Sequence, residues 1–158
     1  MCVSRVVACN GFPCGDVKHD AFVVPGIEIS PEEVSMVMIS EAAPPNPADY
    51  YYAGGDSLFA KTTVQAFLDA GAKVSSVNDI LGLGVYLTTA VKCGKTGYGI
   101  ETGTVKECSH LLEKELALFP NIKAPMLMGD VAIRAINEIT RRTDENHGRG
   151  IIMIGSRT

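Results

Sequence analysis

Glu41 is the carboxylate of this sequence that is best placed to do chemistry. It follows a short apolar run at residues 35–40, and Ala42, Ala43 and two prolines come after it. Such a run between chain breakers is typical of a buried strand in a parallel sheet, and α/β proteins bind ligands at the carboxyl ends of these strands. A carboxylate there can orient and activate a water molecule. The alternative is a capping or solvated carboxylate.

Cysteines form the second candidate group, with five in the chain. Cys9 and Cys14 lie in an irregular, glycine-containing stretch, whereas Cys93 is expected in a loop and Cys108 near the start of a helix. Four thiolates from these two pairs could enclose an iron–sulfur cluster or a tetrahedral zinc ion. Because no double C-x-x-C signature is present, the alternative that Cys93 and Cys108 are small core residues stays open. Cys2 is the spare thiol, unless it replaces Cys9.

Further polar and aromatic residues are expected near Glu41. Thr88 and Thr89 lie close to the carboxyl end of a second apolar run, and Gly129 precedes Asp130 after a third. These tips should converge if the strands are neighbours. The three tyrosines at 50–52 could stack on a flat ring or could close the core under a long loop. We expect structural or exposed roles for the histidines, which share no element: His19, His110 and His147.

The elements that must position these residues alternate along the chain. Strands are expected at 35–40, 85–91, 125–129 and 151–154, and helices at 57–70, 78–83, 105–119 and 130–141. This alternation predicts an α/β fold, a three-layer αβα sandwich with a mainly parallel central sheet of about four strands. Residues 1–34 show little periodicity, and we interpret them as an irregular arm that contains cysteines.

Length and composition limit the class of protein. A chain of 158 residues with 46% hydrophobic composition is expected to form a single domain with a real core. The net charge of −4 argues against a generic nucleic-acid binder. Neither a membrane-spanning run nor a signal-like start is present, so we expect no membrane partner and a cytoplasmic protein with reduced thiols.

Several segments occur in the order and spacing of a known family: residues 38–45, 52–54, 85–93, Cys108 and 127–132. Together they resemble the uracil-DNA glycosylase superfamily, and most of all its iron–sulfur branch. The resemblance implies a uracil-DNA glycosylase-like fold and an enzyme of base-excision DNA repair. This hydrolase would cleave the N-glycosidic bond of uracil, or of a related deaminated base, in single- or double-stranded DNA. We expect it to act as a monomer.

The resemblance also implies roles for residues around Glu41. The family motif Gly-Glu-Ala-Pro-Gly matches residues 40–44 with one inserted alanine, so Glu41 would position the attacking water. Backbone amides near Ala42 and Ala43 would meet the base. Tyr52 matches the aromatic residue that stacks on uracil.

Two further matches concern the second apolar run. Thr89 stands where the family has an asparagine that reads the uracil edge, and it offers one hydroxyl in place of an amide. Lys92 falls on the lysine of the family's Thr-Asn-Val-Val-Lys-Cys motif, and we expect it to contact DNA phosphates.

The resemblance favours a [4Fe-4S] cluster on Cys9, Cys14, Cys93 and Cys108. Zinc is the alternative, and a cluster can be lost in a recombinant preparation. The family's final His-Pro-Ser motif has no counterpart, so we interpret the chain as truncated at its C-terminus. The alternative function is an inactive or vestigial metal-binding, nucleic-acid-binding α/β domain.

Overall fold

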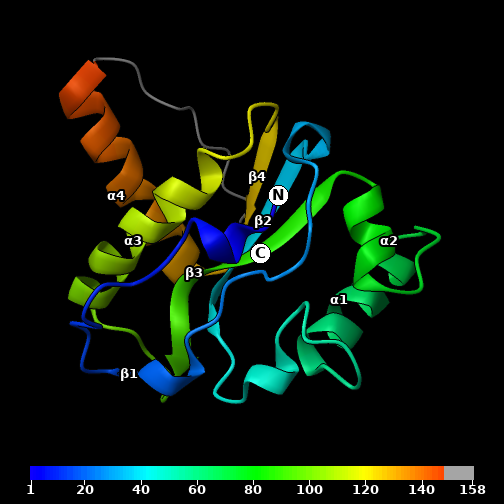
Figure 1. The fold of residues 1–158 in the computed structure, drawn as a ribbon, viewed down its shortest axis with the longest axis horizontal. Helices are drawn as coiled ribbons and strands as arrows, with labels where there is room; N and C mark the ends of the chain where they lie inside the picture. Colours follow the sequence, from blue (N-terminus) through cyan, green and yellow to red (C-terminus); the bar gives the residue numbers. More distant parts are fainter. Residues whose placement is uncertain (148–158) are drawn as a thin grey trace.

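The computed structural model describes the backbone of residues 1–147 and the side chains of residues 1–144. In this part the fold is α/β, with helices around a four-stranded mixed sheet (Figure 1). The strands are β1 Val17–Lys18, β2 Met36–Ala43, β3 Val85–Lys95 and β4 Ala124–Leu127. The α-helices are α1 Leu58–Asp69, α2 Val77–Gly82, α3 Thr102–Leu116 and α4 Asp130–His147. The strand predicted at residues 151–154 lies outside the described residues.

The order of the strands in the sheet is β1-β3-β2-β4. Strand β2 is interior and pairs in parallel with both neighbours, so that Met36 lies opposite Val85 and Ala124. The prediction of a mainly parallel sheet needs correction, because the N-terminal arm adds β1 antiparallel to the end of β3. A strand of only two residues is too short to show a period in the sequence.

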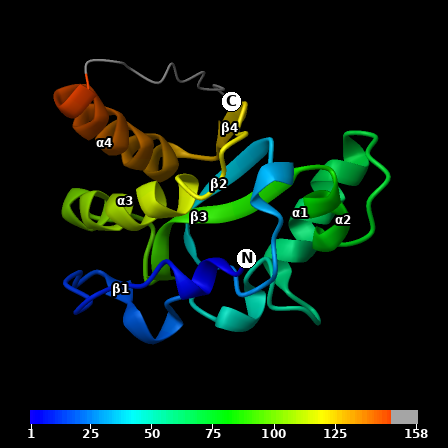
Figure 2. The ribbon, with the colours of Figure 1, turned by 45° about the horizontal axis from the view of Figure 1, so that its top comes forward.

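Helices cover both faces of the sheet, as the alternation of β2 requires. Val37 and Ile39 pack in one hydrophobic cluster with α3 and α4, whereas Met36 and Met38 contact a second cluster that includes residues of α1 and α2. Figure 2 shows these helix pairs on opposite sides of the strands. The arrangement is consistent with three αβα layers.

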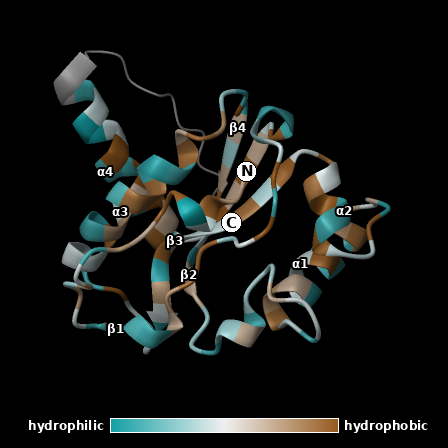
Figure 3. Cartoon of the chain, in the orientation of Figure 1, coloured by the Kyte–Doolittle hydropathy of each residue, from teal (hydrophilic) through white to brown (hydrophobic). Residues whose placement is uncertain are grey.

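The helices begin and end where local chemistry favours it. The Ser57 side chain caps α1 by accepting the amide of Ala60 at 3.3 Å, and Gly71 follows the helix with φ +91°. Helix α4 begins at Asp130, as predicted, and carries both hydrophobic and hydrophilic segments (Figure 3). No helix in the described part of the chain is long and apolar enough to cross a membrane.

Two strands run further than predicted. Strand β2 continues through Ala43, so Glu41 lies in the strand near its carboxyl end and does not follow it. Strand β3 continues to Lys95, so Cys93 lies in a strand and not in a loop. The N-terminal arm is also more than an irregular appendage, because Val3, Val7 and other apolar residues of the arm are buried in the larger cluster.

Candidate functional site

Glu41 lies where the carboxyl ends of three strands meet. Its side chain is 37% exposed, and its Oε2 accepts a hydrogen bond from Lys95 Nζ on β3 at 3.0 Å. The other carboxylate oxygen faces Gly129 after β4: a Cβ built on this glycine would lie 2.9 Å from Glu41 Oε1. Glu41 and Gly129 therefore converge as predicted. The structure adds Lys95 to this site, which was not predicted from the sequence. Lys95 reaches Glu41 because β3 extends to residue 95, and the predicted strand ended at residue 91.

Ala42 and Ala43 end β2 next to Glu41, and both are buried. Ala42 lies opposite Val91 and Ala43 opposite Gly94, so the pairing of β2 with β3 shifts between them. Such an irregularity at the end of a strand can redirect backbone groups. That these amides meet a base stays a prediction.

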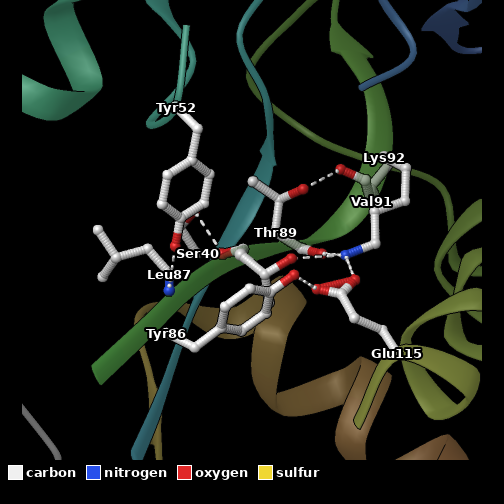
Figure 4. Close-up of polar contacts among 9 residues, drawn as sticks. Ser40, Tyr52, Tyr86, Leu87, Thr89, Val91, Lys92 and Glu115 are labelled. Carbon is white, nitrogen blue, oxygen red and sulfur yellow. Dashed lines mark hydrogen bonds and ion pairs between the residues drawn. The ribbon is translucent and has the colours of Figure 1, made fainter. Parts of the chain in front are cut away.

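Tyr52 is held inside the fold by its hydroxyl group and its ring. The hydroxyl accepts the backbone amide of Leu87 at 2.8 Å, and the ring stacks on Tyr86 with 6.3 Å between centroids (Figure 4). Burial raises the pKa of this phenol well above its usual value. Tyr52 also lines a cavity of about 560 Å³ beside α1 and α2, which Glu41 does not line.

Thr89 is a residue of β3, and its side chain is fully buried. Its hydroxyl donates to the carbonyl oxygen of Val91 at 2.8 Å (Figure 4). In the sheet, Thr89 lies opposite Ser40, one residue before Glu41. Because neighbouring residues of a strand point to opposite faces, this register separates the hydroxyl of Thr89 from the carboxylate of Glu41.

Lys92 forms a buried ion pair, which shows that the predicted phosphate contact is wrong. The side chain has no exposed surface, and its Nζ lies 2.5 Å from Glu115 Oε2 on α3 (Figure 4). The ammonium also donates to Thr88 Oγ1 at 2.8 Å and to the Thr89 carbonyl at 2.6 Å. Tyr86 donates to the other Glu115 oxygen at 2.9 Å. Lys92 faces α3 and therefore cannot reach a ligand in solvent.

The four predicted cysteine ligands gather at one place. Cys93 of β3 and Cys108 of α3 are buried in the larger hydrophobic cluster, against which Cys9 and Cys14 also pack. A cavity of about 250 Å³ is lined by Cys9, Cys14 and Cys108, with Glu107, His110 and Lys114 among its other residues.

Electrostatic effects connect the same four thiols. Burial, followed by the negative charge of Cys108, Cys9 and Cys14, raises the pKa of Cys93 to about 12. Burial also raises the pKa of Cys108, and Cys14 and Cys9 act on it in the same direction. Cys2 is absent from both sets of neighbours, and its Sγ lies 3.0 Å from Ser4 Oγ.

The donor set fits a thiolate-ligated group. Four cysteines on a loop, a strand and a helix suit an iron–sulfur cluster, and they also suit zinc. Within residues 1–144, no group of three or more His, Cys, Asp and Glu side chains is arranged to hold a metal ion as it stands.

Two places thus bring together residues with chemistry: the Glu41 edge, defined as Glu41, Lys95 and Gly129, and the cysteine site, defined as Cys9, Cys14, Cys93 and Cys108. In comparisons with known proteins, the chain matches no family model and no curated protein.

Proposed function

We propose that this chain is a DNA glycosylase of the uracil-DNA glycosylase superfamily, which hydrolyses the N-glycosidic bond of uracil or a related deaminated base. The observation that carries the proposal is the placement of Glu41. It is a partly exposed carboxylate at the carboxyl end of an interior parallel strand, beside a lysine and a close-packed glycine. This is the edge where open α/β sheets bind ligands.

The reaction requires a base that has left the DNA stack. The target nucleotide would be extruded so that its sugar and base reach the Glu41 edge. Glu41 would hold a water molecule and favour the positive charge that develops on the sugar as the bond stretches. Backbone amides near Ala42 and Ala43 would stabilise the departing base, which carries negative charge.

DNA phosphates would be met by the lysines at the same edge of the sheet. Lys95 is 30% exposed, and Lys18 of β1 donates to the carbonyl oxygen of Pro45 at 3.2 Å in the loop after β2. Both lysines lie where β1 pairs with the end of β3. They replace Lys92 in this role, because Lys92 is buried.

The cysteine site would hold a [4Fe-4S] cluster, with zinc as the alternative. Such a group would link the N-terminal arm to β3 and α3, which is a structural role. Hydrolysis of a glycosidic bond involves no change of oxidation state, so the reaction itself does not need an electron carrier.

A second candidate function is a metal-binding domain that binds nucleic acid without turnover. The burial of Thr89 and the internal hydrogen bond of Tyr52 favour it, because neither residue faces Glu41. This candidate predicts weak, salt-sensitive DNA binding and no release of base.

The test compares Glu41→Gln with the wild-type chain in uracil release from a single-stranded oligonucleotide. The amide keeps the shape of the side chain but cannot act as a base, so we expect release to fall about 10²–10⁴-fold. Glu33→Gln is the matched control, because Glu33 is exposed and precedes the opposite end of β2. Wild-type release by Glu41→Gln would remove Glu41 from the mechanism. A wild-type chain that binds DNA but releases no uracil would favour the second candidate.

A further inference from the structure

The cysteine site depends on two segments that are far apart in the sequence. Cys9 and Cys14 lie on the N-terminal arm, whereas Cys93 lies on β3 and Cys108 on α3. The four thiols can share one ligand only if the arm is held against β3 and α3 at a fixed distance. Asp16, two residues after Cys14, makes the polar contacts that do this.

Asp16 contacts residues that lie in the sequence between Cys93 and Cys108. Its Oδ2 accepts the backbone amide of Glu101 at 2.7 Å, and its Oδ1 accepts the hydroxyl of Thr104. Its backbone carbonyl accepts the hydroxyl of Thr96 at 2.8 Å. Thr96 comes three residues after Cys93, and Thr104 comes one helical turn before Cys108. The arm is thus tied to β3 and α3 close to each cysteine.

These contacts also supply the cap that α3 lacks. The N-cap residue Glu101 makes no side-chain capping hydrogen bond. The first turn of a helix has amides without intrahelical partners, and a carboxylate there accepts their hydrogen bonds and complements the helix dipole. Asp16 does so from a distant segment. The cap of α3 is therefore also a tertiary contact of the arm.

Thr104 connects the carboxylate to the cysteine site. It is buried, and its hydroxyl donates a hydrogen bond to the carboxylate of Asp16, two residues after Cys14. Burial raises the pKa of Cys14, and the side chain of Thr104 opposes the rise. The next two residues of the arm, Val17 and Lys18, continue the attachment by pairing with Lys95 and Gly94.

We infer that Asp16 is a positioning residue for the cysteine site, which sets the distance between the Cys9–Cys14 pair and the Cys93–Cys108 pair through Glu101 and Thr104. This inference rests on the metal site of the proposed function. It concerns residues that do not themselves bind the metal, and such residues typically change metal affinity 10–100-fold when they are replaced.

The test titrates the full chain, freed of metal and with reduced thiols, with Co²⁺ alone. Thiolate-to-cobalt absorption reports how many cysteines bind the ion, independently of any enzymatic activity. Iron and sulfide content after anaerobic reconstitution is the second measurement. The variants are Asp16→Ala, Asp16→Asn, Thr104→Val and Thr104→Ser, and Asp20→Ala is the matched control because Asp20 is an exposed acid of the same arm.

We expect wild type, Asp20→Ala and Thr104→Ser to bind Co²⁺ alike. Asp16→Ala and Thr104→Val should bind about tenfold more weakly or more, with fewer thiolates per ion. Asp16→Asn keeps the size of the side chain, so a weaker signal at an unchanged unfolding midpoint would separate positioning from general stability. If Asp16→Ala does not fold, Asp16→Asn and Thr104→Val decide the question.

Wild-type affinity and spectrum in the Asp16 and Thr104→Val variants would overturn the inference. A wild-type chain that binds Co²⁺ without its thiolates would overturn it as well, while leaving uracil release by Glu41 intact. A third outcome is that the wild-type chain releases no uracil while the Asp16 variants lose Co²⁺ binding. That result would support the inference about Asp16 and contradict only the proposed glycosylase activity.

Discussion

The cysteine site and the Glu41 edge differ in how the fold assembles them. The four cysteines come from distant segments and still meet, because β1 pairs with β3 and α3 packs on β3. Tyr52 and Thr89 come from segments close to Glu41 in the fold but do not reach it. The first site needs only the right topology, whereas the second also needs the right direction of each side chain.

The two regions are joined at β3. Cys93 and Lys95 both lie in this strand, and a Cβ built on Gly94 between them would meet Ala21 of the arm as well as the loop after Glu41. Substitutions in β3 should therefore affect both the cysteine site and the Glu41 edge. Substitutions outside β3 should affect only one of the two regions.

Lys92→Met has the largest expected effect. It leaves the Glu115 carboxylate buried without its cation, which should lower the free energy of unfolding by about 3–5 kcal/mol. The double variant Lys92→Met/Glu115→Met removes both charges and should recover much of this loss. Urea denaturation of the wild-type, single and double variants measures the difference. A single variant as stable as the double one would contradict the importance of this ion pair.

Gly94→Ala should disturb both regions at once. The added Cβ would lie 2.7 Å from Ala21 Cβ and 3.1 Å from the Pro44 carbonyl oxygen. Because backbone atoms on one side cannot give way, we expect a loss of up to about 3 kcal/mol in unfolding free energy. Co²⁺ binding and uracil release should fall together. Gly99→Ala is the control, because its Cβ would meet no atom within 4 Å.

Gly129→Ala should affect the Glu41 edge alone. Gly129 has φ +111°, and its added Cβ would meet Glu41 Oε1 at 2.9 Å. We expect about 1–2 kcal/mol of destabilisation and a displaced carboxylate. Uracil release should fall while Co²⁺ binding is unchanged. Gly55→Ala adds backbone strain at φ +58° without a contact within 4 Å, so equal losses of uracil release in both variants would refute a specific effect on Glu41.

Lys95→Met should have the smallest effect on stability. The ion pair with Glu41 is partly exposed, so its loss should cost less than about 1 kcal/mol. If Lys95 meets a phosphate, the slope of log K for duplex DNA against log salt should decrease in magnitude by about 0.9. Lys61→Met is the control, because Lys61 of α1 forms an exposed ion pair with Asp56, which precedes the helix. Equal slopes in the two variants would exclude the phosphate contact.

Hydrophobic runs and breakers predicted most of the elements, because an apolar run as short as residues 35–40 between chain breakers favours a strand over a helix. The approach of Gly129 to Glu41 was also predictable, since the ends of parallel strands share one edge. Strand β1 was not, because Val17–Lys18 is too short to show a period.

The burial of Lys92 could not be predicted from the sequence either. A lysine after an apolar run usually lies at the surface, and its burial here depends on Glu115, which a separate helix supplies. The position of Tyr52 could not be predicted for the same reason. Its hydroxyl accepts the backbone amide of Leu87, which belongs to β3 and is distant in the sequence.

The Lys92–Glu115 pair also bears on how the chain finds its correct strand pairing. A slip of one residue between β2 and β3 would turn every side chain of β3 to the opposite face of the sheet. Lys92 would then point away from α3, and two buried charges would lose each other. The apolar residues of β3 could tolerate such a slip far better than this pair could. We therefore expect the ion pair to act mainly by making misaligned sheets unfavourable, because a slipped register would leave both charges buried and unpaired.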